Sequence, residues 1–175
     1  MNALLVYESM FGSTEAIARA IAAGLAPHMQ TDVVEVADAL LAISAETDVL
    51  IVGGPTHTFS MSRMQTRNDA VTRGGHAPRD GIGIREWLDQ LDVTSATHLR
   101  AATFDTRVSS MKRWPGSAAK SAVKVLGRKR VAVVAKPISF YVKDVTGPLA
   151  SGELARAHHW GDQLGQSLST TKEKS

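Results

Sequence analysis

The stretch LVYESMFGSTEAIARAIAAGL, residues 5–25, carries the clearest signal of the fold, because an apolar strand leads through a short loop directly into a helix. The apolar residues 3–7 predict the strand, and the spacing of four between Ile17, Ile21 and Leu25 predicts a helix from about residue 14 to residue 25. The loop between them, residues 9–14, carries three hydroxyl side chains and one glycine. The first amide groups of a helix have no hydrogen-bond partners within the helix. Either a side chain of the loop caps these groups, which makes the loop a capped turn, or the loop is an anion-binding site.

The rest of the chain continues this alternation of apolar strands and helical patterns. We expect further strands at residues 32–36, 48–54, 99–106 and 130–142, the last broken near Pro137, and further helices at residues 84–91, 117–126 and 151–168. Apolar strands that alternate with helices indicate a parallel sheet covered on both faces, which is the doubly wound α/β class. We therefore expect a single domain over residues 1–168 and a polar C-terminal tail over residues 169–175.

Composition excludes several kinds of protein. The 175 residues are 43% hydrophobic and include no cysteine, which excludes disulfides, thiolate metal sites and cysteine nucleophiles. No run of about 18 apolar residues predicts a membrane span, and the first ten residues lack the basic start of a secretory signal. No histidine or acidic cluster has metal-ligand spacing. We expect a cytoplasmic protein that binds no metal.

The basic residues are unevenly distributed. Residues 107–130 hold eight lysines and arginines and no acid, and residues 61–85 hold five arginines against two aspartates. Such segments are typical of binding to nucleic acid, to a small anionic ligand or to an acidic partner, and they are equally typical of a solvated surface. Because aromatic residues are few, we do not expect nucleic acid as a partner.

The loops that leave the first, third and fourth strands are where a ligand is expected, since parallel α/β sheets bind ligands beyond the carboxyl ends of their strands. These loops cover residues 9–14, 55–63 and 105–116. The first loop does not match the Walker A motif, which ends in Gly-Lys followed by Ser or Thr. It also does not match the dinucleotide-binding fingerprint, which needs three spaced glycines.

Residues Leu5–Ile21, LVYESMFGSTEAIARAI, resemble the flavodoxin signature. In that signature, two aliphatic residues and an aromatic are followed at fixed spacing by Ser or Thr, a small residue, Thr, Ala and an aliphatic residue. Every constrained position is filled here, by Leu5, Val6, Tyr7, Ser9, Gly12, Thr14, Ala18 and Ile21. The resemblance implies a flavodoxin-like three-layer sandwich with a five-stranded parallel sheet of order 2-1-3-4-5, and it implies FMN as the cofactor.

The resemblance also implies which residues hold the cofactor. The first loop, which would bind the FMN phosphate, contributes Ser9, Met10, Phe11, Gly12, Ser13 and Thr14. The second loop would contact the flavin ring through Pro55, Thr56, His57, Thr58 and Phe59, and the third through Asp105, Thr106 and Arg107. Phe59 is the best stacking residue among them, although a loop phenylalanine serves as well to cover the core.

The chain departs from small flavodoxins in its charge, because those proteins surround the ring with acids and this chain has arginines in the corresponding loops. Positive charge favours the anionic reduced flavin and suits an anionic reductant. The stretch GPLASGELARAHHWG, residues 147–161, is similar to a subgroup that includes protoporphyrinogen-oxidase-like proteins.

We therefore expect an FMN-binding redox protein, foremost a reductase that passes electrons to a quinone or similar acceptor, with residues 61–83 as a lid or substrate loop. The alternative is a non-enzymatic electron carrier or flavin store. The expected partner is an anionic reduced cofactor or a redox protein, and a homodimer is left open. No side chain is assigned a catalytic role, since the flavin carries the chemistry.

Overall fold

A computed structural model describes residues 1–172, apart from the side chains of residues 79, 171 and 172. Its first half contains β1 (Asn2–Tyr7), α1 (Ser13–Leu25), β2 (Gln30–Glu35), the 3₁₀ turn η1 (Val36–Asp38), β3 (Val49–His57), β4 (Ser60–Met61), α2 (Met64–Thr72), η2 (Arg79–Gly81) and α3 (Ile84–Gln90). Its second half contains β5 (Arg100–Val108), η3 (Ser109–Met111), α4 (Ala118–Arg128), β6 (Ala132–Val133), β7 (Ile138–Val142) and α5 (Glu153–Lys172).

The sheet confirms the predicted order. Its path is β2-β1-β3-β5-β6, all parallel, and β7 also pairs in parallel with β5. The predicted fifth strand is thus present in two pieces, β6 and β7, separated around Pro137, which cannot donate a backbone hydrogen bond to a ladder. The only antiparallel strand on the described part of the sheet is the two-residue β4, which pairs with the end of β3.

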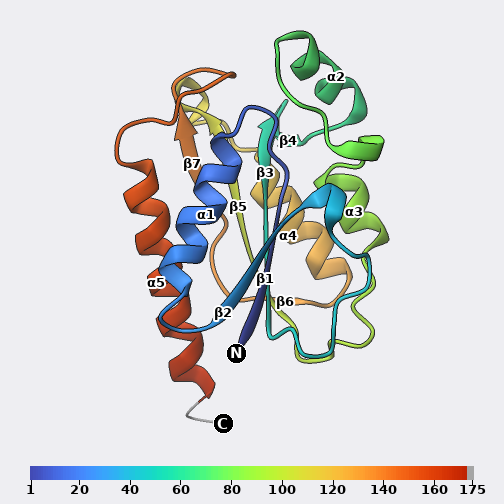
Figure 1. The fold of residues 1–175 in the computed structure, drawn as a ribbon, viewed down its shortest axis with the longest axis vertical. Coiled ribbons are helices and arrows are strands. Elements are labelled where there is room, and N and C mark those ends of the chain that lie inside the picture. Colours follow the sequence, from blue (N-terminus) through green and yellow to red (C-terminus); the bar gives the residue numbers. More distant parts are fainter. Residues whose placement is uncertain (173–175) are drawn as a thin grey trace.

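Helices cover both faces of the sheet, giving three layers (Figure 1). On one face, Ile17, Ile21 and Leu25 of α1 pack with Leu164 of α5 against the sheet, and all four side chains are buried. On the other face, α3 and α4 enclose a second core that includes Trp87. This arrangement places the carboxyl ends of β1, β3 and β5 together at one end of the molecule.

The two helices on the first face approach each other very closely. A Cβ atom on Gly24 of α1 would lie 2.0 Å from the carbonyl oxygen of His158, and one on Gly161 of α5 would lie 2.3 Å from that of Ile21. Glycine at both positions therefore allows the two backbones to come into contact.

The structure corrects the expected description of residues 61–83 as a loop, because this segment contains part of β4 and the helix α2. The buried residues of α2 are Arg67 and Ala70, so the helix has no apolar stripe that periodicity could detect. The last helix also differs: α5 continues to Lys172, and only residues 173–175 of the predicted tail lie outside the described residues. No helix within residues 1–172 is long and apolar enough to cross a membrane.

Candidate functional site

A cavity of about 270 Å³ lies at the carboxyl ends of the strands, between the three loops named above. Ten of the fourteen predicted residues line it: Met10, Phe11, Ser13, Thr14, Pro55, Thr56, His57, Thr58, Thr106 and Arg107. Ser9 and Gly12 line a second hollow of about 550 Å³, which shares Met10 and Phe11 with the first. Phe59 and Asp105 line neither. The fold thus brings the three loops to one place.

The first loop ends in a helix start that no side chain caps. Gly12 is the N-cap residue of α1 and has φ +87°, a left-handed conformation that favours glycine. Its side-chain position is open, since a Cβ there would meet nothing within 4 Å. The buried hydroxyl of Ser9 has no hydrogen-bond partner among the described residues. An unpartnered hydroxyl beside uncapped amide groups is a suitable environment for an anion.

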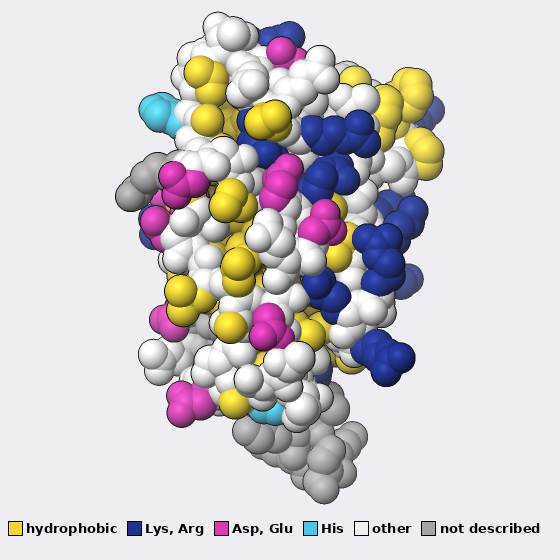
Figure 2. Space-filling view, turned by 90° about the vertical axis from the view of Figure 1, so that its right-hand side faces the viewer, with side chains coloured by type: hydrophobic (Ala, Val, Ile, Leu, Met, Phe, Trp, Pro, Cys, Tyr) yellow, Lys and Arg dark blue, Asp and Glu magenta, His cyan; other side chains and the backbone are white. Residues whose placement is uncertain are grey.

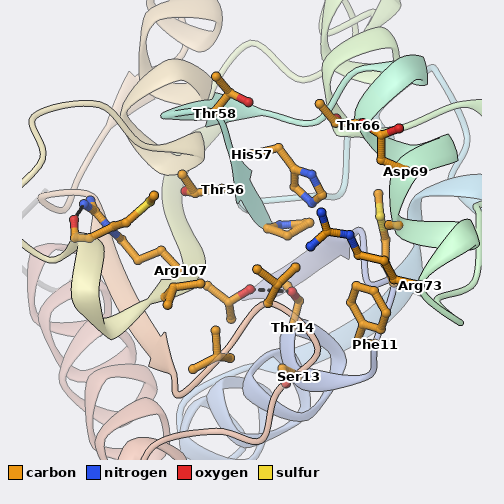
Figure 3. Close-up of a pocket in the computed structure, with 18 residues that line it drawn as sticks. Phe11, Ser13, Thr14, Thr56, His57, Thr58, Thr66, Asp69, Arg73 and Arg107 are labelled. Carbon is orange, nitrogen blue, oxygen red and sulfur yellow. Dashed lines mark hydrogen bonds between the residues drawn. The ribbon is translucent and has the colours of Figure 1, made fainter.

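The first and third loops are joined by two threonines. The hydroxyl oxygens of Thr14 and Thr106 lie 2.7 Å apart in a buried hydrogen bond, which Figure 3 shows at the base of the cavity. This bond links the first turn of α1 to β5, so the first and third loops are held together at the base of the cavity.

The second loop is a tight turn between β3 and β4. Thr58 and Phe59 have φ of 46° and 64°, and His57 pairs with Ser60 across the turn. Two successive residues with positive φ favour glycine or asparagine, so this turn holds some backbone strain. The ring of Phe59 stacks on Trp114, with centroids 4.8 Å apart and an interplanar angle of 20°. In this structure Phe59 therefore covers Trp114 and does not line the cavity.

The third loop is held by two buried ionisable side chains, Asp105 and Arg107. One carboxylate oxygen of Asp105 accepts a hydrogen bond of 3.0 Å from the amide of Ala119, which fixes the start of α4. Burial raises the pKa of Asp105, which is fully enclosed. Arg107 donates to the carbonyl oxygens of Met111, Trp114 and Gly116, so its guanidinium organises the loop over residues 109–116.

One wall of the cavity comes from α2, which the sequence did not indicate. Thr66, Asp69, Ala70 and Arg73 line it, at helical spacings of three and four residues, and these spacings are the signal that could have located them. In Figure 3 the guanidinium of Arg73 and the imidazole of His57 both point into the cavity. Burial and the nearby charge of Arg67 lower the pKa of His57, while Asp69 opposes this effect, so the imidazole is neutral at pH 7. The remaining cavity residues outside the predicted set are Val108, Met111, Val142 and Val145.

A buried polar network connects α2 to the end of β1. Ser62 donates to one oxygen of Glu8 at 2.6 Å, and the amide of Ile84 donates to the other at 2.8 Å. Arg67 donates to the Ser62 hydroxyl at 2.9 Å and forms an ion pair of 3.1 Å with Glu86. Glu8 occupies an unconstrained position of the signature, so sequence reasoning assigned it no role. Burial raises the pKa of Glu8. The hydrogen bonds from Ser62 and Ile84 and the charge of Arg67 act in the opposite direction but do not cancel this effect.

Within residues 1–172, no group of three or more histidine or acidic side chains could hold a metal ion. The polar groups that line the cavity are hydroxyls, backbone amides, the guanidinium groups of Arg73 and Arg107, the carboxylate of Asp69 and the imidazole of His57.

Comparisons with known proteins agree with this geometry at the level of fold. No protein-family model matches the sequence, and no curated protein matches it. The structure is similar to a flavodoxin from the domain Archaea, with 18% identity, a TM-score of 0.60 and coverage of 95% of this chain and 98% of that one. It is similar to oxidised flavodoxin 2 from Bacillus cereus, with 16% identity, a TM-score of 0.62 and coverage of 95% and 99%.

The rubredoxin oxygen:oxidoreductase of Desulfovibrio gigas is also similar, with 15% identity and a TM-score of 0.65. That match covers 97% of this chain but 36% of the larger protein. At these identities the comparisons show the fold alone, and they confirm the prediction: the chain has the flavodoxin-like fold over nearly its whole length.

Proposed function

We propose that the chain is an FMN-binding redox protein of the cytoplasm. The observation that carries this proposal is the first loop, where the uncapped start of α1 lies beside the unpartnered hydroxyl of Ser9. A phosphate at this point would accept hydrogen bonds from the free amides and from Ser9, and it would interact favourably with the helix dipole.

The residues of the three loops have the polar and apolar groups that the phosphate and the ring of FMN require. Ser9, Gly12 and Ser13 would hold the phosphate, and the cavity residues of the second and third loops would contact the ring. When bound, FMN supplies the chemistry of accepting and donating electrons. The chain itself would orient the ring through Pro55–Thr58 and would limit the access of water through the apolar side chains of Met10 and Met111.

Within this role we favour a reductase that acts on a quinone or similar acceptor over a simple carrier. The cavity is mostly apolar with a few polar groups that face inward, which is typical of a small-molecule site. The Desulfovibrio gigas neighbour is by its name an oxidoreductase. The same proposal includes two points that rest on the sequence alone: that the chain belongs to the protoporphyrinogen-oxidase-like subgroup, and that it can form a homodimer.

The carrier alternative has its own support in the surface. Figure 2 shows lysine and arginine side chains gathered along one side of the molecule. Of the basic residues in and before α4, Lys112, Arg113, Lys120, Lys124 and Arg128 are exposed. Such a surface attracts an acidic partner, which an electron carrier would need, or an anionic reduced cofactor.

The cofactor assignment is tested by comparing FMN with riboflavin, which lacks the phosphate, in titrations followed by flavin fluorescence. The wild-type protein should bind FMN one-to-one and at least about tenfold more tightly than riboflavin, because a charged ligand gains strong hydrogen bonds. Ser9→Ala should weaken FMN binding by about fivefold to tenfold and leave riboflavin binding unchanged.

Urea denaturation provides the control for this variant. Since the Ser9 hydroxyl has no hydrogen-bond partner among the described residues, Ser9→Ala should unfold at the same urea concentration as the wild type. Equal affinities for FMN and riboflavin would contradict the phosphate assignment.

Reductase and carrier are then distinguished by turnover. The FMN-loaded protein is mixed with a reduced nicotinamide and a soluble benzoquinone, and loss of nicotinamide absorbance is recorded. Sustained turnover above that of free FMN supports the reductase. Turnover equal to that of free FMN contradicts the reductase and favours the carrier.

A further inference from the structure

The helix α2 presents one regular face to the cavity. Thr66, Asp69 and Ala70 of α2 and its C-cap residue Arg73 all line the cavity, and their spacing places them along one side of the helix. The side chains of Thr66, Asp69 and Arg73 lie along one wall of the close-up in Figure 3, opposite the end of β5. This wall lies at the edge of the cavity that we propose takes the flavin ring.

The wall is fixed to the rest of the protein by Arg67. This residue is only 2% exposed, and its guanidinium contacts Ser62, the carbonyl oxygen of Gly81 and the carboxylate of Glu86. A buried arginine with all these partners holds its helix in one position, since any movement would leave charges unpaired. The position of the α2 backbone that carries Arg73 is thus set in advance of ligand binding.

Arg73 is the available cation of the cavity. Its guanidinium makes no hydrogen bond or ion pair with any residue in the described part of the chain, whereas the guanidinium of Arg107, which also lines the cavity, donates to three carbonyl oxygens. The neighbouring His57 is neutral at pH 7 and can donate or accept a hydrogen bond. Asp69 also faces the cavity and opposes the binding of an anion there.

An apolar surface lies next to this cation. In Figure 3 the ring of Phe11 lies beside Arg73. The ring packs closely against Gly75, where a Cβ would lie 2.9 Å from it. Ala70 of α2 and Met10 of the first loop extend the apolar surface. A planar aromatic group can pack on such a surface while a negative substituent reaches the guanidinium.

We propose that Arg73 and His57 form a recognition site for the negative group of a small aromatic substrate, whose ring packs against Phe11 and Ala70. The proposal deepens the reductase role and rests on it for the identity of this ligand as a substrate. The acceptor would accordingly be an aromatic or quinonoid molecule that carries a carboxylate or a similar anion.

The test measures the binding of two matched probes, 2-naphthoate and its neutral amide, to the full-length protein by isothermal titration calorimetry. Each probe is titrated into the protein with and without FMN. The variants are Arg73→Gln, Asp69→Asn and, as the control, Arg63→Gln. Arg63 is exposed at the start of the same helix, and its side chain does not line the cavity.

The wild-type protein should bind naphthoate about tenfold more tightly than the amide, as expected for a hydrogen bond between charged groups. Arg73→Gln should reduce this preference to less than about twofold, whereas Arg63→Gln should keep it. Asp69→Asn should tighten naphthoate binding by about threefold without affecting the amide, because a repelling charge is removed. A wild-type protein with no preference, a preference that survives Arg73→Gln, or an unchanged affinity in Asp69→Asn would each overturn the proposal.

FMN titrations of the same variants distinguish this proposal from the proposed function. If Arg73→Gln weakened FMN binding by more than about tenfold and left riboflavin unaffected, Arg73 would be a ligand of the FMN phosphate, and the proposal would fall. If no variant bound FMN, the proposed function would fail, while the naphthoate preference of the FMN-free protein would still decide the role of Arg73.

Discussion

The hydroxyl groups of Thr14 and Thr106 lie 2.7 Å apart in the protein interior, although 92 residues separate them in the chain. The bond ties the first turn of α1 to the carboxyl end of β5. It therefore couples the stability of the fold to the geometry of the cavity.

Replacing either threonine by valine should destabilise the protein by about 1–3 kcal/mol, because the other hydroxyl is left buried without its partner. The double variant Thr14→Val/Thr106→Val should lose less than the sum of the single changes, with a coupling of at least about 0.5 kcal/mol. Urea denaturation of the four proteins measures this cycle. Strict additivity would show that the two hydroxyls do not interact.

The raised pKa of Glu8 predicts a pH dependence of stability. Because burial raises the pKa above its ordinary value of 4.5, the folded protein keeps a proton that the unfolded chain releases. This contribution to stability is fully present below the ordinary value and is lost as the pH rises through the folded pKa. The unfolding free energy of the wild type should therefore fall, relative to Glu8→Gln, as the pH is raised from about 4 to about 8.

The measurement is urea denaturation of both proteins at several pH values, with Glu46→Gln as the control because Glu46 is exposed. A constant difference between wild type and Glu8→Gln across this range would show that Glu8 does not titrate differently on folding.

Contact between α1 and α5 predicts opposite effects at two helical glycines. Gly24→Ala should destabilise the protein by about 1–3 kcal/mol, despite the better helix propensity of alanine, since the new Cβ would overlap the carbonyl oxygen of His158. Gly127 of α4 has nothing within 4 Å of its Cβ position, so Gly127→Ala should be neutral or stabilise by up to about 1 kcal/mol. Thermal unfolding of both variants checks the contrast, and equal effects would rule out the helix contact as its cause.

The lowered pKa of His57 makes anion binding depend on pH. Burial and the charge of Arg67 lower the pKa of His57 below its ordinary value of 6.5, although the charge of Asp69 opposes this effect. The imidazole is therefore neutral at pH 7 and gains a proton only at lower pH. Naphthoate should therefore bind more tightly as the pH falls from about 7 to about 5, and this gain should be absent in His57→Gln. The same protonation costs stability, since the contribution of a lowered histidine pKa is lost as the pH falls through the folded value. Calorimetric titrations over this range provide the test, and an identical pH profile in the variant would exclude His57 as the source.

Part of the site could be predicted because its signals are local. Residues 5–25 contain a continuous apolar strand, a loop with hydroxyls and a glycine, and a helix with one apolar face, so they specify their own conformation. The apolar runs likewise predicted the other strands, including the break near Pro137, while the order of the strands followed from the resemblance to the flavodoxin signature. These features depend on neighbours in the chain, which periodicity and propensity report.

The rest of the site depends on contacts between distant residues. The resemblance predicted that Phe59 and Asp105 would contact a flavin, but only packing decided that Phe59 stacks on Trp114 and that Asp105 fixes the start of α4. The helix α2 gave no apolar pattern because its buried face carries Arg67, whose partners come from other segments.

Local order along the chain was enough to predict the class of fold and the three loops, and the flavodoxin-like signature led us to propose an anion-binding site at the start of α1. Which charged side chains remain without a partner at the cavity became clear only from the folded structure. The guanidinium of Arg107, which lines the cavity, and that of Arg67, which does not, are occupied by partners within the described residues, while the guanidinium of Arg73 at the cavity is not. The physical reason is that the availability of a charged group depends on every group packed around it, and that environment exists only once the chain has folded.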